Sequence, residues 1–256
     1  MSELRHDQLA THVLADRDAV GSAAAAHVGE RLKAILARTD RARLIFAAAA
    51  SQNEFLDALA AVDGIDWVRV EAFHLDEYVG LATGDPRSFG EWLERRIWSR
   101  VWPGRVAKLD GAAAAVDADA ECARYGRLLD DGGIDLALLG VGENGHLAFN
   151  DPHVADFDDP LTVKPVEIDD TSRRQQVRDG AFASFADVPR LAMTVTMSAL
   201  LASRSISVVV PGEQKAGAVA RLLLGPIETA CPASALRRHP DAVMFVDEAA
   251  ITGVPR

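Results

Sequence analysis

The stretch LLGVGENGHLAFNDP, from Leu138 to Pro152, decides how the fold of this chain is interpreted. It begins inside a short apolar run, Ile134–Leu139, which predicts a buried strand. Gly140 and Gly142 follow at once, and glycine allows a tight turn in which the backbone approaches a ligand closely. A buried strand that ends in a glycine-rich turn predicts a binding site at that strand end.

Polar side chains capable of proton chemistry follow this turn. Asn144, His146 and Asp151 lie within eight positions of one another. Histidine can move protons near neutral pH, and a nearby carboxylate such as Asp151 can fix its tautomer. A histidine beside a strand is often only a hydrogen-bonded structural residue. The flanking glycines and polar neighbours make a catalytic role for His146 an equal alternative.

Hydrophobic periodicity along the chain predicts alternating strands and helices. Apolar, β-rich runs occur at Leu44–Phe46, Trp67–Phe73, Ile134–Leu139, Leu191–Val195, Ile206–Val210 and Val243–Val246. Helical spacing occurs at Asp7–Ala37, Asn53–Ala61, Phe89–Val101, Ala118–Leu129 and Gln214–Leu224. This alternation predicts a doubly wound, Rossmann-like α/β fold, with a mostly parallel sheet flanked by helices. No linker rich in Pro, Gly or Ser interrupts it, so we expect one domain over residues 1–256.

One segment departs from the alternation. Pro152–Pro189 is polar and has little apolar periodicity. Because it follows the candidate site directly, it can be interpreted as a lid or irregular cover. A solvated surface excursion is the equal alternative.

A second candidate site feature is FHLDEYVGL, from Phe73 to Leu81, where Asp76 and Glu77 are adjacent at the end of a predicted strand. Neighbours in an extended segment point apart, so only one of the two faces a cleft. A carboxylate beside apolar strand ends can have its pKa raised toward a useful value for proton abstraction. Asp76 or Glu77 is therefore a candidate general base, although adjacent acids are often merely solvated.

A candidate anion site lies where Gln214 and Lys215 open a helix directly after the strand Ile206–Val210. A helix N-terminus has free N–H groups and the positive end of the helix dipole, which suit an anion. An exposed lysine with no ligand is the alternative.

Charge and cysteine content exclude several classes of function. The net charge of -11 argues against nucleic acid or an anionic membrane as a partner, and no apolar run approaches the roughly 18 residues that span a bilayer. The two cysteines, Cys122 and Cys231, form no disulfide framework or zinc set. No cationic segment leads into an apolar signal core at the start. We expect a cytoplasmic protein.

No nucleophile or metal set accompanies His146. The sequence contains no GxSxG elbow, neither cysteine adjoins a histidine, and the seven histidines lack metal-ligand spacing. Proton-transfer chemistry without a cofactor or a metal is the reaction class that we expect.

Four motifs together resemble the glucosamine-6-phosphate deaminase/isomerase family, whose fold is shared with the 6-phosphogluconolactonases. They are LDEYVGL at Leu75–Leu81, GVGENGHLAFNDP at Gly140–Pro152, GEQKA at Gly212–Ala216 and GPIETACPASALRRHP at Gly225–Pro240. The resemblance covers roughly Arg43 to Asp247, and DEYVGL resembles the deaminase branch, where the lactonases typically have DER.

The resemblance implies conversion of glucosamine 6-phosphate to fructose 6-phosphate and ammonia, an aldose–ketose isomerisation with deamination. It implies that Asp76 moves a proton between C2 and C1, that His146 assists ring opening, and that Asn144 and Asp151 orient that histidine. The remaining residues implied to contact this small sugar phosphate are Ser51, Gln52, Glu77, Gly142, Lys215 and one arginine among Arg173, Arg174 and Arg178. A homo-oligomer is a further expectation.

The chain differs from the family pattern at three places. AAAASQNEF at Ala47–Phe55 stands where the family usually has a phosphate loop of the form SGSTP. Asn144 replaces a common acid, and Asp151 stands where glutamate is usual. These differences keep two alternatives open, a 6-phosphogluconolactonase-like hydrolase and a non-catalytic regulator that binds a sugar phosphate.

Overall fold

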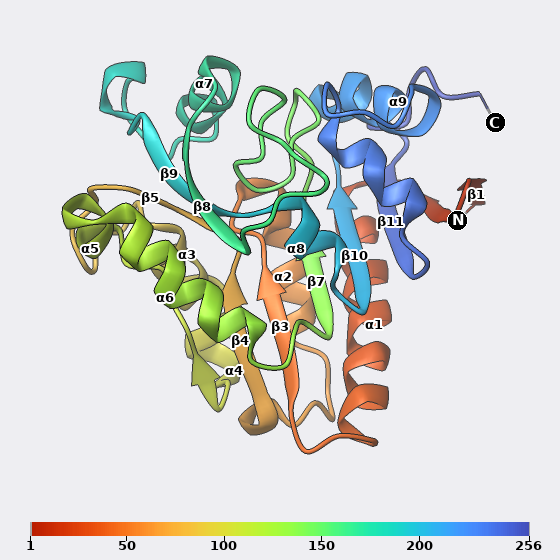
Figure 1. The fold of residues 1–256 in the computed structure, drawn as a ribbon. Helices are drawn as coiled ribbons and strands as arrows, with labels where there is room; N and C mark the ends of the chain where they lie inside the picture. The colour runs from red at the N-terminus through yellow and green to blue at the C-terminus, as the bar shows by residue number, and fades with distance from the viewer. Residues whose placement is uncertain (1, 256) are drawn as a thin grey trace.

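The computed structural model describes residues 2–255 as alternating strands and helices around a central sheet (Figure 1). The strands are β1 (Ser2–His6), β2 (Leu9–Leu14), β3 (Ala42–Phe46), β4 (Val70–His74), β5 (Asp76–Tyr78), β6 (Arg105–Val106), β7 (Leu136–Leu139), β8 (Val163–Glu167), β9 (Leu191–Val195), β10 (Ser205–Val210) and β11 (Ala242–Asp247).

The helices connect these strands and cover the sheet. The α-helices are α1 (Arg17–Leu36), α2 (Asn53–Ala60), α3 (Phe89–Leu93), α4 (Ser99–Val101), α5 (Gly111–Val116), α6 (Ala118–Asp130), α7 (Asp170–Arg178), α8 (Met197–Leu201) and α9 (Ala216–Leu224). The 3-10 helices are η1 (Ala50–Gln52), η2 (Trp67–Arg69), η4 (Phe185–Asp187), η5 (Glu213–Lys215) and η6 (Pro232–Arg238), and one π-helical turn, η3 (Glu94–Trp98), joins α3 to α4.

The main sheet has eight strands in the order β1-β2-β11-β10-β7-β3-β4-β6. All neighbouring pairs are parallel except the β1–β2 hairpin. From β3 the chain proceeds to β4 and β6 on one side, whereas β7, β10 and β11 follow on the other. The strand order therefore reverses between β3 and β7, and in such sheets ligands bind beyond the carboxyl ends of the strands at this reversal.

Alternating side chains of the strands enter two separate hydrophobic cores. On β3, Ile45 joins the core under α6, α8, α9 and η6, whereas Leu44 and Phe46 join the core under α1 and α2. A strand buried on both faces must be apolar at successive positions, as these strands are. The predicted mostly parallel sheet with helices on both faces is confirmed.

A second, smaller sheet was not predicted. It contains β5, β9 and β8, and both of its strand pairs are antiparallel. The run Leu191–Val195 is a strand as predicted, but the expectation that it pairs in the parallel sheet is wrong, because it lies between β5 and β8. This sheet matters for the site because the pairing of Asp76 with Thr194 fixes the start of β5.

The beginning of the chain also differs from the prediction. A helix from Asp7 is wrong, because Leu9–Leu14 forms β2 against β11 and the helix begins only at Arg17. Asp16 is the N-cap of α1, and its carboxylate accepts a hydrogen bond from the backbone N–H of Ala19 at 2.9 Å. Serine, threonine, asparagine and aspartate are favoured at this position because they satisfy free N–H groups of the first turn.

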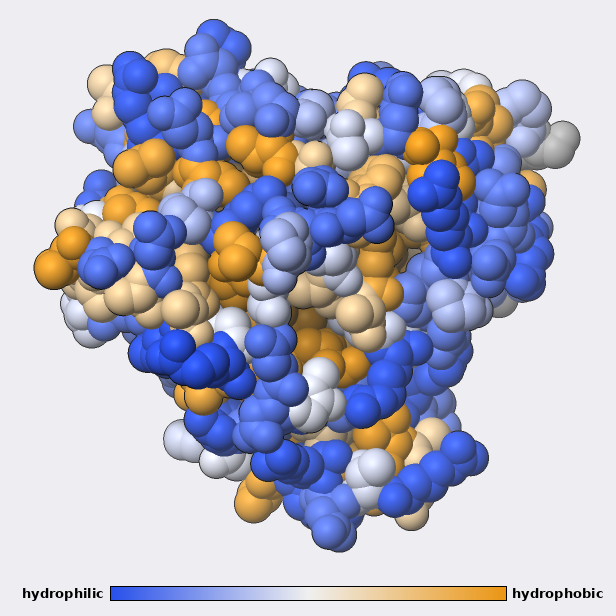
Figure 2. All heavy atoms as spheres, in the orientation of Figure 1, coloured by the Kyte–Doolittle hydropathy of each residue, from blue (hydrophilic) through white to orange (hydrophobic). Residues whose placement is uncertain are grey.

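The polar segment 152–189 forms an ordered layer above the sheet. It contains β8 and α7, and Figure 1 shows α7 above the carboxyl ends of the strands. Figure 2 shows that the face with α6 and α8 is largely hydrophilic, with hydrophobic residues in scattered patches. Within residues 2–255, no helix is long and apolar enough to cross a bilayer.

Candidate active site

Four neighbouring strands, β4, β3, β7 and β10, direct their carboxyl ends toward one cavity. The loop after each strand contributes to its wall, and the backbone N–H of Ala47 after β3 donates to the carbonyl of Leu138 in β7 at 2.8 Å. The cavity measures about 60 Å³, and its polar lining residues are Ser51, Asp76, His146, Gln175, Gln176 and Lys215. Sequence positions far apart are thus brought together at the point where the strand order reverses.

His146 lies directly against the glycine-rich turn. A Cβ atom at Gly142 would lie 2.1 Å from Cε1 of the imidazole, so any side chain at position 142 would overlap the ring. Gly142 therefore makes room for His146. Its expected contact with a substrate remains a prediction.

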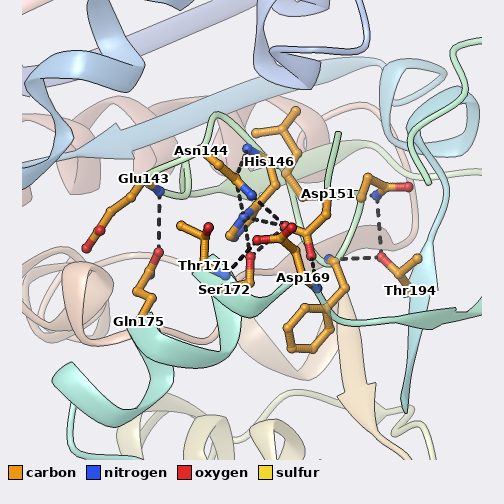
Figure 3. Close-up of polar contacts among 12 residues, drawn as sticks. Glu143, Asn144, His146, Asp151, Asp169, Thr171, Ser172, Gln175 and Thr194 are labelled. Atoms are coloured by element: carbon orange, nitrogen blue, oxygen red, sulfur yellow. Dashed lines mark hydrogen bonds and ion pairs between the residues drawn. The ribbon is translucent and has the colours of Figure 1, made fainter. Parts of the chain in front are cut away.

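Three oxygen atoms surround Nδ1 of His146 (Figure 3). Asn144 Oδ1 lies at 2.7 Å, Ser172 Oγ at 3.0 Å and Asp151 Oδ1 at 3.0 Å. Because the asparagine and carboxylate oxygens can only accept, the Nδ1–H tautomer satisfies this arrangement best. Nε2 is then the ring nitrogen with a free lone pair for the cavity that His146 lines.

Asp151 is the centre of this network. Its Oδ1 atom accepts hydrogen bonds from Asn144 Nδ2 at 2.9 Å and from Ser172 Oγ at 2.5 Å, and its Oδ2 atom accepts from the backbone N–H of Asp169 at 2.9 Å. Burial alone would raise the pKa of Asp151, but the contacts with His146, Asn144 and Ser172 outweigh it and lower the pKa to about 2. Asp151 is therefore an ionised partner for His146.

The pKa of Asp76 is shifted in the opposite direction to that of Asp151. The residue is 7% exposed, and within residues 2–255 its carboxylate accepts no hydrogen bond. Burial raises its pKa well above the ordinary value, and the charges of Glu77 and Asp151 raise it further. A buried carboxylate that lines the cavity and has a raised pKa is suited to accept a proton from a ligand.

Glu77 points away from the cavity toward α3. Its Oε1 atom accepts from the backbone N–H of Tyr78 at 2.9 Å and of Phe89 at 3.2 Å, and its Oε2 atom accepts from Gly90 at 3.0 Å. Burial raises its pKa to about 6 although these hydrogen bonds oppose the shift. The structure does not bring Glu77 to the proposed substrate site, because its acceptor positions satisfy the first turn of α3.

A residue not singled out from the sequence, His74, holds the backbone of Asp76. Its Nδ1 atom lies 2.9 Å from the carbonyl of Asp76, and its Nε2 atom accepts from the backbone N–H of Leu109 at 2.9 Å. Burial lowers the pKa of His74 to about 4, so the ring is neutral at pH 7. The neutral Nδ1–H tautomer fits both contacts.

Lys215 supplies a buried positive charge to the same cavity. It is 3% exposed, and its ammonium has no hydrogen-bond or ion-pair partner within the described residues 2–255. Burial lowers its pKa, while Asp179 and Glu143 act in the opposite direction. An unpaired buried ammonium is costly unless a ligand provides the anion.

The three candidate arginines have different surroundings. Arg173 is buried and donates to the carbonyls of Phe185 and Val188, and Arg174 is exposed and pairs with Asp170. These contacts place neither arginine at the cavity. Arg178 is exposed and pairs with Glu143, and it is one of the charges that act on Lys215.

Ser172 is the main site residue that the sequence analysis missed. It is 1% exposed and lies in the first turn of α7, which Asp169 caps through a hydrogen bond to the backbone N–H of Thr171. An acid three residues before Ser172 is a recognisable helix start. Nothing in the sequence, however, indicates that this turn packs against a loop more than twenty positions earlier.

Comparisons with known proteins show the family of this chain. The family model described as Glucosamine-6-phosphate isomerases/6-phosphogluconolactonase matches residues 15–245. A glucosamine-6-phosphate deaminase of Arthrobacter sp. (strain FB24) is 36% identical over 231 residues, which cover 88% of this chain and 86% of the relative. The chain belongs to this family.

Solved structures place the fold within the same group. A structure described as a monomeric glucosamine-6-phosphate deaminase superposes with a TM-score of 0.86 at 29% identity, over 94% of this chain and 98% of that chain. A 6-phosphogluconolactonase from Thermotoga maritima gives a TM-score of 0.75 at 19% identity, over 94% of this chain and 100% of that one. The second likeness concerns the fold alone.

In this member of the glucosamine-6-phosphate isomerase/6-phosphogluconolactonase family, an alanine-rich loop follows β3. Gln52 is 1% exposed, and its Nε2 atom donates to the carbonyl of Val209 at 3.1 Å and to Ser51 Oγ at 3.2 Å. A Cβ atom at Gly140 would approach Gln52 Nε2 to 2.8 Å. Gln52 therefore stabilises the loop through these hydrogen bonds. Of the two side chains, only that of Ser51 lines the cavity.

A second cavity adjoins the first in this family member. It measures about 320 Å³, shares Ala48, Ala49, Phe89 and Gln176 with the inner cavity, and extends between Trp92 and Asp179. Sites for small molecules usually measure about 300–1,000 Å³. The inner cavity alone is too small for a sugar phosphate, so a ligand of that size needs both.

Proposed function

We propose that this protein is a cofactor-free glucosamine-6-phosphate deaminase, which converts glucosamine 6-phosphate and water to fructose 6-phosphate and ammonia. One observation carries the proposal. Asp76, a buried carboxylate with no hydrogen-bond donor in the described residues, and His146, whose Nδ1 is held by Asn144, Asp151 and Ser172, line the same cavity.

His146 acts on the closed sugar. Its Nε2 atom accepts the proton of the C1 hydroxyl and delivers it to O5 as the bond between C1 and O5 breaks. Asp151 stabilises the imidazolium that forms, because a carboxylate at 3.0 Å from Nδ1 favours the charged ring. The product of this step is the open-chain amino aldehyde.

Asp76 acts on the open chain. Its carboxylate accepts the proton from C2 while O1 takes up a proton from solvent, which gives an enolamine, and the carboxyl group then returns its proton to C1. The resulting imine at C2 takes up water and releases ammonia, which leaves the ketose. A carboxylate whose pKa is raised by burial accepts a proton more readily than an ordinary aspartate does.

Lys215 and Arg178 hold the phosphate in this proposal, and Ser51 contributes a hydrogen bond. Charge-assisted hydrogen bonds to phosphate are stronger than neutral ones, and Lys215 has no protein anion in hydrogen-bond contact with its ammonium within residues 2–255. Helix α7 covers the cavity through Gln175 and Gln176, so segment 152–189 serves as the cover of the site.

The test is incubation of the purified protein with glucosamine 6-phosphate, with ammonia and fructose 6-phosphate measured separately. Both products must form in equal amounts. If the folded protein forms neither product, the proposed reaction is wrong. Hydrolysis of 6-phosphogluconolactone would assign the lactonase reaction instead.

A sugar-phosphate-binding regulator is the second candidate function. Asn144 favours it, because the amide holds Nδ1 of His146 at 2.7 Å but cannot accept a proton. A thermal shift with glucosamine 6-phosphate and no product after long incubation would identify a regulator.

Two further expectations belong to the proposal. Both cysteines are buried free thiols, as is usual in a reducing compartment, which supports a cytoplasmic location. We expect a homo-oligomer, whereas the similar deaminase structure is described as monomeric. Light scattering of the purified protein distinguishes the two states.

A further inference from the structure

Glu143 follows Gly142, which lines the cavity, and forms an ion pair with Arg178. The pair joins Glu143 Oε2 to Arg178 Nη2, and the side chains are 24% and 50% exposed. Glu143 is in the glycine-rich turn after β7, and Arg178 is the last residue of α7. One of the two arginines whose charges act on Lys215 is therefore already bound to an anion of the protein itself.

The backbone of Glu143 is fixed, whereas its carboxylate has room to move. Its N–H donates to Gln175 Oε1 at 3.3 Å, as Figure 3 shows, and its carbonyl accepts from Arg221 Nη2 at 3.1 Å. The partly exposed carboxylate has Arg178 as its ion-pair partner. A change of side-chain rotamer would release Arg178 without moving the turn.

The charges around Lys215 are balanced only while Glu143 remains. The charged groups that act on the ammonium are Asp179, Glu143, Arg178 and Arg17, two negative and two positive. A phosphate that entered beside Lys215 would meet the Glu143 carboxylate as a like charge. Moving Glu143 away would both remove this repulsion and free Arg178.

We propose that Glu143 is an internal anion that occupies Arg178 in the unliganded protein and that the phosphate of the ligand displaces. Glu143 thereby sets the affinity of the site for phosphate and its preference for phosphorylated over neutral sugars. This inference rests on the proposed function for its natural ligand, but the charge exchange itself can be tested with inorganic phosphate.

The experiment is a double-mutant cycle with Glu143→Gln, Arg178→Gln and the double variant, in which calorimetry measures binding of inorganic phosphate and glucosamine 6-phosphate. Glu143→Gln should tighten phosphate binding by about tenfold, because Arg178 becomes free to form a charge-assisted bond. Arg178→Gln alone should change the affinity by less than about threefold, whereas in the Glu143→Gln background it should cost about tenfold.

Asp57→Asn is the matched control. Asp57 lies on α2 and pairs with Arg96 of η3 and Arg100 of α4, so this change removes the same charge and also breaks ion pairs. Phosphate affinity should not change. Glucosamine without a phosphate should bind the wild type and Glu143→Gln equally.

Unchanged or weaker phosphate binding by folded Glu143→Gln would overturn the inference and make the ion pair a structural link between α7 and the turn. If Glu143→Gln does not fold, the phosphate affinity of Arg178→Gln is the measurement that tests the inference. A loss of more than tenfold in that single variant would show that Arg178 is already available to phosphate. Turnover is measured separately, so tighter phosphate binding without product would reject the proposed reaction and leave the exchange intact.

Discussion

His146 Nδ1 lies 3.0 Å from Asp151 Oδ1, and the same carboxylate oxygen accepts hydrogen bonds from Asn144 and Ser172. One oxygen thus connects the turn after β7 to the first turn of α7. The orientation of the imidazole depends on where α7 docks as well as on its own loop.

Ser172→Ala tests this dependence. The change removes a hydroxyl within 3.0 Å of His146 Nδ1 and leaves Asp151 with one donor fewer. A lost buried hydrogen bond costs about 1–3 kcal/mol, so we expect kcat to fall by about tenfold or more with little change in KM. Ser172→Thr keeps the hydroxyl and should restore kcat. Equal kcat for Ser172→Ala and the wild type would show that the hydroxyl does not position the ring.

The sequence was sufficient to predict five strands of the main sheet, β3, β4, β7, β10 and β11, and the meeting of Asp76 with His146. Each residue follows an apolar strand, and the carboxyl ends of parallel strands share one edge of a sheet. Both strands were predicted because they are buried on both faces and therefore read as apolar runs.

Ser172 could not be found in this way. Its partner Asp151 lies in a different loop, and the contact between them is set by the antiparallel pairing of β8 and β9. β8 (Val163–Glu167) is short, half-exposed and contains Pro165, so no apolar run indicates it. The β1–β2 hairpin was missed for a related reason, because the edge strand β1 is exposed and polar.

Asp76→Asn tests the proposed base. Asparagine keeps nearly the same shape and cannot accept the proton, so kcat should fall by about 10² to 10⁴ while the affinity for a sugar phosphate changes little. Glu77→Gln is the matched control. It should retain turnover but lower the free energy of unfolding by about 0.5–2 kcal/mol, because Glu77 accepts hydrogen bonds from the first turn of α3. The opposite pattern, with near-full turnover in Asp76→Asn, would transfer the role of base to Glu77.

The pH profile of kcat/KM should report the raised pKa of Asp76. Burial, then the charges of Glu77 and Asp151, raise this pKa, and only the ionised form accepts a proton. Activity should therefore be lost as the pH falls through a value above the ordinary range of aspartate, about 3.9. In Asp151→Asn one like charge is gone, so the acid limb of the residual activity should move to lower pH. An acid limb that stays in place or moves upward would contradict the assignment.

His146→Gln tests the ring-opening role. Glutamine offers no group that exchanges a proton near neutral pH, so the closed sugar should lose more turnover than an open-chain analogue of the substrate. The ratio of the two defects is the informative quantity, because a general loss of folding or binding affects both. Equal defects would remove ring opening from the mechanism.

Lys215→Met separates the contribution of the ammonium to binding from its effect on stability. Within residues 2–255 the buried ammonium has no ion-pair partner, so a methionine of similar length should raise the free energy of unfolding of the unliganded protein by about 1–3 kcal/mol. Folding lowers the pKa of Lys215, so the buried charge destabilises the wild type fully at a pH below the pKa of the folded state. This destabilisation is lost as the pH rises from that pKa toward 10.5, the pKa of the unfolded state. Urea unfolding at pH 7 and pH 10 should therefore show a difference in the free energy of unfolding between the variant and the wild type that is smaller at pH 10.

The same variant should bind a phosphorylated sugar tenfold to a hundredfold more weakly, with the affinity for the unphosphorylated sugar unchanged. A variant that is less stable than the wild type at pH 7 and binds phosphate as before would mean that Lys215 supports the fold and does not hold the anion.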